Sequence, residues 1–309
     1  MTIHLTILRH MKMRRILVLS LLVALSSTSL LAWGEKGHYI SNEAATLGLP
    51  NDMPTFFYKR FPELVWLGFD PDRQRGGGES LEAFNAPNHF LDMEYVEGLK
   101  LPPERYQFLD LMYSSNRLRQ HGITNSEAGF LPWQIAEVAQ ALQVEFRLWR
   151  ASQPGSSERQ AIENDIIHLA GTLGHFVADG ANPHHATTHY NGWAGPNPNG
   201  YPNDCGTHSR FERDFVSHAV ETKDVVPKLA AEPVLRTDYF ATAVEHLRAS
   251  NALTERIYQL DKARAFDTLR PVSAEGFDFA TSRLAAGASL LRDIWWSAWR
   301  NSEQQRRRD

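Results

Sequence analysis

The sequence lacks several features that define large classes of proteins. It has a single cysteine, Cys205, in 309 residues, which excludes an internal disulfide framework. Its mean hydropathy of −0.39 is too low for a polytopic membrane protein. Glycine (20 residues) and proline (16 residues) are near average, which excludes collagen-like and low-complexity proteins. The remaining class is that of globular proteins, and the chain is long enough to bury a sizeable core.

Basic charge is scarce outside the amino-terminal segment. Residues 1–32 hold four basic residues and no acidic one, which leaves 28 basic against 36 acidic residues, a net charge of −8, for the rest. Such a chain has no broad basic surface for gripping long phosphate backbones. The tail Arg306–Asp309 is expected to be a solvated terminus.

The first 32 residues have the layout of a secretory signal peptide. The positively charged part contains Lys12, Arg14 and Arg15. The apolar run Ile16–Leu25 follows, and small polar residues then lead to Ala32. This run is about half as long as a membrane span requires. We therefore expect a secreted or periplasmic protein with no transmembrane segment in the mature chain, whose domain covers residues 33–309. Met11 and Met13 are alternative starts.

Beyond residue 33 the helical period dominates, and convincing alternating strands are absent. Apolar residues of 132–149 fall on one helical face. A second helix, capped by Ser156 or Ser157, is expected to run to about Asp179, where Gly180 would break it.

The second half of the chain continues this pattern after one interruption. Residues 186–207 are rich in glycine, asparagine and proline and are predicted to form a loop. Helical pattern resumes from Phe211, and a last amphipathic helix covers 277–295. The sequence therefore predicts one all-α domain.

Histidines and carboxylates with metal-ligand spacing lie on and after the helix 161–179. His175 and Asp179 are four residues apart, so both side chains can converge on one cation. His185 follows six residues later, which completes the string H-x3-D-x5-H. His168 is a weaker candidate on the same face, and His184 is as well explained by a surface position.

Further candidate ligands lie outside this helix. His208 and Glu212 repeat the four-residue spacing after the loop. Other imidazoles and carboxylates precede the helix: His38, Asp70, Asp72 and His89. Each element alone is weak, but together they provide the mixture of ligands that zinc prefers.

This pattern resembles the zinc-dependent phospholipase C and P-one-type nuclease superfamily, which comprises secreted all-helical enzymes with three zinc ions. The signature of that group is a mature amino-terminal Trp, an early His, an Asp and a His, then H-x3-D-x5-H and H-x3-[DE]. This sequence carries all of them in order from Trp33 to Glu212. It departs from the usual His-Gln before the proline, where Ala181 and Asn182 stand, but the ligands are intact.

The resemblance implies three zinc sites. One zinc ion would be held by Asp72, His89, His175 and Asp179. A second would be held by His185, His208 and Glu212. The third would be held by the amine and carbonyl of Trp33, by His38 and by a bridging Asp179. Cleavage after Ala32 would then create a ligand, because an α-amino group titrates near 8 and binds metal once deprotonated.

The resemblance also implies catalytic roles at the first carboxylate. Asp72, with Arg75 three residues on, matches the nuclease pattern D-x-x-R, but Asp70 and Arg73 have the same spacing. We favour Asp72, whose distance from His89 is nearer to that in the family. Asp72 would be both a ligand and the base or orienter for the attacking water, and Arg75 would stabilise the phosphoryl charge.

The substrate remains open between two branches. His208-x3-Glu212 looks like the phospholipase branch, whereas Trp33-x4-His38 and D-x-x-R look like the nuclease branch. We predict a phospholipase-C-like phosphodiester hydrolase that acts on a phospholipid head group. The alternatives are a single-strand-specific endonuclease and a non-catalytic secreted metal-binding helical protein. No stable protein partner is implied.

Overall fold

The computed structural model describes residues 33–303. The predicted signal peptide and the charged tail lie outside these residues. Every regular element from 33 to 303 is a helix, and β structure is limited to two isolated bridges, Leu91 with Gly129 and Tyr190 with Gly192. The prediction of an all-α chain is therefore confirmed. None of the described helices is both long and apolar enough to span a membrane.

The helices before residue 131 are mostly short. They are α2 (Glu35–Leu47), α3 (Thr55–Lys59), α4 (Phe61–Leu67), α5 (Asp70–Gln74), α6 (Glu79–Asn85), η1 (Ala86–His89), η2 (Met93–Val96), α7 (Arg105–Ser114), α8 (Arg117–His121) and α9 (Asn125–Ala128).

The part of the described chain from residue 131 onward contains the three longest helices. Its elements are α10 (Leu131–Ala151), α11 (Ser157–Ala181), η3 (Pro183–Ala186), α12 (Thr207–Ser209), the π-helical turn η4 (Arg210–Phe215), α13 (Val216–Ala219), α14 (Thr222–Val225), η5 (Val226–Lys228), α15 (Tyr239–Asn251), α16 (Thr254–Lys262) and α17 (Ala274–Asn301). The predicted helices 132–149 and 277–295 correspond to α10 and α17, each longer than expected. The predicted loop corresponds to the irregular segment 187–206.

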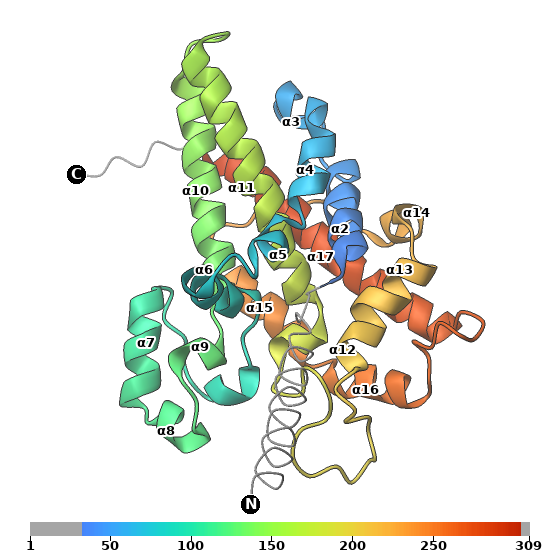
Figure 1. Cartoon of the computed structure of the whole chain (residues 1–309). Helices are drawn as coiled ribbons and strands as arrows, with labels where there is room; N and C mark the ends of the chain where they lie inside the picture. Colours follow the sequence, from blue (N-terminus) through green and yellow to red (C-terminus); the bar gives the residue numbers. More distant parts are fainter. Residues whose placement is uncertain (1–32, 304–309) are drawn as a thin grey trace, which may run out of the picture. The chain divides into compact units, whose positions relative to one another are not determined.

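Helix α11 lies at the centre of the packing. It contacts α10, α17, α15, α4 and α2, and Figure 1 shows it beside α10 with α17 crossing behind. Its first half has the expected two faces, with Ile162 and Ile166 buried and His168 exposed. Its second half is buried almost all round, because α2, α15 and α17 cover it. The polar face predicted for His175 and Asp179 therefore points into the protein, not into solvent.

The carboxyl end of α11 differs from the prediction at Gly180. This residue stays helical, and the helix ends at Ala181. Gly180 instead allows α15 to approach, since a Cβ there would lie 2.8 Å from Cδ2 of His246. Ser250 of α15 donates its hydroxyl hydrogen to the Gly180 carbonyl at 2.6 Å. The glycine is thus needed for helix crossing and not for breaking the helix.

A second glycine of α11 brings two other helices close. A Cβ at Gly174 would overlap the side-chain amide of Asn42 on α2. The Asn42 amide donates to the carbonyls of Leu64 at 2.7 Å and of Gly171 at 3.0 Å, so it ties α2, α4 and α11 together. This close packing places the residue after α4, Gly68, against His175 on α11.

Candidate metal centre

The eight predicted side-chain ligands lie together, although they come from seven helices. They are His38 on α2, Asp72 on α5, His89 on η1, His175 and Asp179 on α11, His185 on η3, His208 on α12 and Glu212 on η4. None of them is more than 5% exposed. They form three groups with donor atoms within 4.8 Å of one another: His38–His175–Asp179, Asp72–His89–His175 and His185–His208–Glu212.

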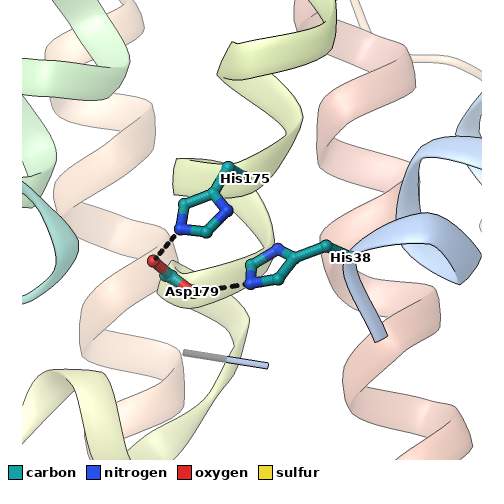
Figure 2. A group of neighbouring side chains, drawn as sticks. All are labelled: His38, His175 and Asp179. Atoms are coloured by element: carbon teal, nitrogen blue, oxygen red, sulfur yellow. Dashed lines mark ion pairs between the residues drawn. The ribbon is translucent and has the colours of Figure 1, made fainter. Parts of the chain in front are cut away.

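The first two groups share His175, and we call their five residues the α11 cluster. Asp179 lies between the groups, with Oδ1 3.6 Å from Nε2 of His38 and Oδ2 3.3 Å from Nε2 of His175. Figure 2 shows the carboxylate with one oxygen toward each ring. Oδ2 is also 3.0 Å from Nδ1 of His89. The carboxylate of Asp179 therefore lies close to histidines of both groups.

Asp72 completes the α11 cluster. Its Oδ1 lies 3.9 Å from both Nδ1 of His89 and Nε2 of His175. Asp70 lies outside all three groups, with Oδ1 3.5 Å from Nη1 of Arg73. Of the two carboxylates that the sequence left open, only Asp72 belongs to one of the three groups.

The two candidate arginines also differ in position. Arg75 has Nη1 3.9 Å from Oδ1 of Asp72 and Nη2 3.1 Å from Oε1 of Glu82, and its side chain is 17% exposed. The guanidinium of Arg73 instead lies 3.8 Å from the ring centroid of Trp66 and donates to the hydroxyl of Tyr39 at 2.6 Å. Of these two arginines, Arg75 is therefore the one that borders the candidate metal centre.

The third group, His185, His208 and Glu212, is the α12 cluster. Oε2 of Glu212 lies 2.7 Å from Nε2 of His208 and 3.6 Å from Nε2 of His185, and the two Nε2 atoms are 3.2 Å apart. Nδ1 of His185 is 3.9 Å from Oδ2 of Asp179, so the two clusters adjoin. Asn182 donates its side-chain N–H to Oε2 of Glu212 at 3.0 Å.

Backbone carbonyls orient two of the histidines. Nδ1 of His175 donates to the Gly68 carbonyl at 2.9 Å, and Nδ1 of His185 donates to the His89 carbonyl at 2.7 Å. In this tautomer Nε2 keeps its lone pair and can bind a cation. The two carbonyls therefore preset both rings for metal binding.

The segment that carries His89 is fixed by its own backbone. Leu91 donates its N–H to the His185 carbonyl at 3.0 Å, and Leu131 donates to the Phe90 carbonyl at 3.1 Å. Gly129 has φ +93°, and a Cβ there would overlap the Phe90 carbonyl, so only glycine allows this close approach. Residues 89–91 are thus held against both η3 and the start of α10.

Electrostatics in the centre favour a bound cation. Burial lowers the pKa values of His175 and His208 to about 3, so these imidazoles are neutral at pH 7. Burial raises the pKa of Glu212 to about 7, and burial together with the Asp72 charge raises the pKa of Asp179. Neutral imidazoles offer lone pairs, and a divalent cation would stabilise the ionised carboxylates.

Unsatisfied polar atoms support the same fit. Both ring nitrogens of His38 and Oδ1 of Asp179 are buried and make no hydrogen bond with residues 33–303. A buried polar atom without a partner costs free energy, and coordination to a cation removes that cost. Nitrogen and carboxylate oxygen in buried groups of three or more match the ligands of zinc. The residues present therefore fit the implied metal.

Trp33 packs beside the metal centre. Its indole N–H donates to the Ala178 carbonyl at 2.6 Å, and its buried ring lies 5.1 Å from that of Phe211. These contacts hold residue 33 against the turn of α11 that carries Asp179. Binding of zinc by the amine and carbonyl of Trp33 stays a prediction.

Two residues near the ligands were not recognised from the sequence. A surface position for His184 is wrong, because this side chain is 1% exposed. Asn182 orients Glu212, and its Oδ1 accepts from the His184 N–H at 3.1 Å. The available signal was an asparagine directly before a proline, which favours such a turn. His168 is exposed, outside all three groups, and Cys205 is an exposed loop residue.

Comparison with known proteins gives distant likenesses. No family model matches the chain, and no curated protein matches it. Among solved structures, it is similar to the alpha toxin from Clostridium absonum at 12% identity and a TM-score of 0.44, over 88% of this chain and 66% of the toxin. It is also similar to the Clostridium perfringens alpha-toxin from an avian strain at 13% identity and a TM-score of 0.41, over 88% and 65%. The chain thus spans just under two thirds of the length of either toxin.

Proposed function

We propose that this chain is an exported, zinc-dependent phosphodiester hydrolase of the phospholipase C kind. The observation that carries the proposal is the continuous array of eight buried ligands, which His175 and Asp179 join into one centre. Isolated structural zinc sites use four ligands in a closed shell, whereas an array of adjoining groups is typical of centres that act on phosphate esters.

Three zinc ions would be held by this array. Asp72, His89, His175 and Asp179 would hold one, the α12 cluster a second, and Trp33, His38 and Asp179 the third. When bound, the ions polarise phosphoryl oxygens and lower the pKa of a coordinated water.

The chain's own residues would orient the reaction at Asp72 and Arg75. The Asp72 carboxylate would accept a hydrogen bond, and then the proton, from the attacking water. The Arg75 guanidinium can donate to the phosphoryl oxygens as their negative charge increases. Glu82 holds Arg75 from the other side, and one of its oxygens also accepts from the Gly76 N–H at 3.2 Å. This arrangement leaves Arg75 little freedom to turn away from Asp72.

A phospholipid head group is the substrate that we favour. Glu212 at the end of H-x3-E supports this choice, as does the net charge of −8 over residues 33–309, which disfavours a long polyanion. The second candidate is a single-strand-specific endonuclease. It is favoured by one specific observation, the placement of Arg75 beside Asp72 at the D-x-x-R spacing.

The decisive experiment measures metal content and substrate choice on one preparation. The protein is exported to a bacterial periplasm, its amino terminus is sequenced, and zinc per chain is measured. Hydrolysis of bis-(p-nitrophenyl) phosphate, phosphatidylcholine vesicles and single-stranded DNA is then compared with and without a chelator.

We expect a terminus at Trp33, about three zinc ions, and chelator-sensitive hydrolysis that is fastest on phosphatidylcholine. Faster cleavage of DNA would favour the nuclease. Bound zinc without hydrolysis of any of the three substrates would leave a metal-binding protein and overturn the enzymatic proposal.

A further inference from the structure

The side chain of His184 is buried beside the α12 cluster but belongs to none of the three groups. It is 1% exposed, and η3 places it next to His185. Neither of its ring nitrogens makes a hydrogen bond with any described residue. A buried imidazole in this state costs free energy that an apolar side chain would not. Packing alone therefore does not account for a histidine at this position.

Three aromatic rings pack on His184, and they differ in what they offer. The centroid of the His208 ring is 5.0 Å away, and those of Phe211 and Tyr258 are each 6.0 Å away. Phe211 has no polar atom. The Tyr258 hydroxyl accepts from the Gly192 N–H at 2.9 Å and donates to a loop carbonyl. Of the three rings, only that of His208 has a nitrogen without a hydrogen bond.

This nitrogen is Nδ1 of the predicted ligand His208, and we call it the outer nitrogen because the other ring nitrogen, Nε2, lies beside Glu212. His208 presents Nε2 to its cluster, 2.7 Å from Oε2 of Glu212. Its Nδ1 is buried and makes no hydrogen bond with residues 33–303. In His175 and His185 the same atom donates to a backbone carbonyl. His208 thus lacks the acceptor for Nδ1–H that these two histidines have. The rings of His184 and His185 both pack on it with centroids 5.0 Å away, and of these two only His184 lies outside the three groups.

We propose that His184 is a positioning residue that accepts the Nδ1–H of His208 and thereby keeps Nε2 of His208 available for a metal ion. The ring centroids are 5.0 Å apart, so rotation of the His184 ring about its Cβ–Cγ bond, or one bridging water, can join a nitrogen of His184 to Nδ1 of His208 while Nε2 of His208 stays beside Glu212. An acceptor on the outer nitrogen fixes the tautomer and increases the basicity of the ligand. The inference rests on the proposed function, because it requires a cation in the α12 cluster.

Four variants of the zinc-loaded protein test this role. His184→Leu fills the space without an acceptor, whereas His184→Asn and His184→Gln retain one. His246→Leu is the matched control, because His246 is another histidine packed against α11, outside the three groups, with Nε2 3.1 Å from the Val177 carbonyl. Competition with a chromophoric chelator measures the affinity of each bound zinc ion.

We expect His184→Leu to weaken one zinc ion roughly 10- to 100-fold, with the affinity largely restored in His184→Asn or His184→Gln. His246→Leu should leave every zinc affinity unchanged. Equal weakening in all three His184 variants would show a packing role and overturn the proposal. An unchanged titration of His184→Leu would overturn it as well.

A spectroscopic test needs no variant. In nitrogen-15 spectra of the zinc-loaded wild-type protein, His208 should carry its proton on Nδ1, and that proton should exchange slowly with solvent. A rapidly exchanging Nδ1–H would overturn the proposal even if His184→Leu does not fold. A wild-type protein that binds no zinc would overturn the proposed function instead.

Discussion

The α11 cluster and the α12 cluster are held in place by different means. Ligands of the α11 cluster lie on elements fixed by the core, where Gly174 and Asn42 bring α11, α2 and α4 into close contact. In the α12 cluster, His185 lies on η3, whereas His208 and Glu212 follow an irregular segment of 20 residues and lie on a three-residue helix and a π-helical turn.

Side-chain contacts take the place of helix packing at the α12 cluster. Arg210 donates to Asp261 at 2.6 and 3.0 Å and to Asp204 at 2.8 Å, and Thr207 donates its hydroxyl hydrogen to Asp261. These contacts fix Thr207 and Arg210, which lie on either side of His208 in the sequence. Packing of the core can therefore preform the α11 cluster, whereas the α12 cluster depends on a few polar contacts near the surface.

The largest expected effect comes from Asp179, whose two carboxylate oxygens lie near histidines of both groups of the α11 cluster. Asp179→Ala removes both bridging oxygens, so at least two zinc ions should be lost or greatly weakened. Hydrolysis of bis-(p-nitrophenyl) phosphate should fall by more than the roughly 100-fold expected for a residue that only supports a ligand. His168→Ala, on the exposed face of the same helix, is the control and should retain zinc and activity. If both variants lose equal zinc, Asp179 is not a ligand.

The second prediction concerns Arg75, which lies close to ligands of both clusters. Its guanidinium lies by Asp72, and its charge also contributes, after burial, to the low pKa of His208. Arg75→Lys should lower kcat about 10²-fold or more while zinc content stays unchanged, since a lysine cannot reproduce the planar fork of donors. Arg73→Lys is the matched control, because Arg73 packs on Trp66 instead. Equal losses of kcat in the two variants would exclude a special role for Arg75.

Asp261 tests whether the α12 cluster can be weakened without affecting the α11 cluster. Asp261→Asn weakens the contacts with Arg210 and Thr207, so it should loosen only the α12 cluster. We expect one zinc ion to bind roughly 10-fold more weakly and to leave first in a chelator titration. Asp293→Asn removes another buried, paired carboxylate, on α17, and should lower stability without changing zinc affinity. Simultaneous loss of all ions from Asp261→Asn would show that the clusters are not independent.

The sequence predicted those parts of the site that depend on local spacing along one helix. His175 with Asp179, and His208 with Glu212, were recognisable because a four-residue spacing places two side chains on one helical face. Asp70 and Asp72 could not be separated by spacing, since both fit. On α5 they lie about 200° apart around the helix axis, so only one of them can face the centre.

The errors concern tertiary packing. The sequence predicts a helix break at Gly180, but the need for glycine there comes from the approach of α15, which has no local sequence signal. The buried state of His184 depends on Tyr258 and Phe211, which lie far along the chain. Long helices and ligand pairs are local features and were predictable, whereas the contacts between elements were not.

The smallest expected effect is a pH dependence on the α11 side. Asp92, three residues after His89, is 5% exposed, and burial, with a smaller contribution from Glu94, raises its pKa to about 8. Its carboxyl group therefore stays protonated in the folded protein from about pH 4, where the unfolded chain ionises, up to about pH 8. The folded state binds more protons over this window, so the free energy of unfolding falls as the pH rises. Asp92→Asn should remove this loss, which amounts to at most about 1.4 kcal/mol per pH unit. Urea unfolding of both zinc-loaded proteins at pH 5, 6, 7 and 8 measures the difference, with the exposed Asp110→Asn as control. A difference in unfolding free energy between wild type and Asp92→Asn that does not change with pH would show that the pKa of Asp92 is the same in the folded and the unfolded protein. The segment that carries His89 would then add no pH dependence to the stability of the α11 side.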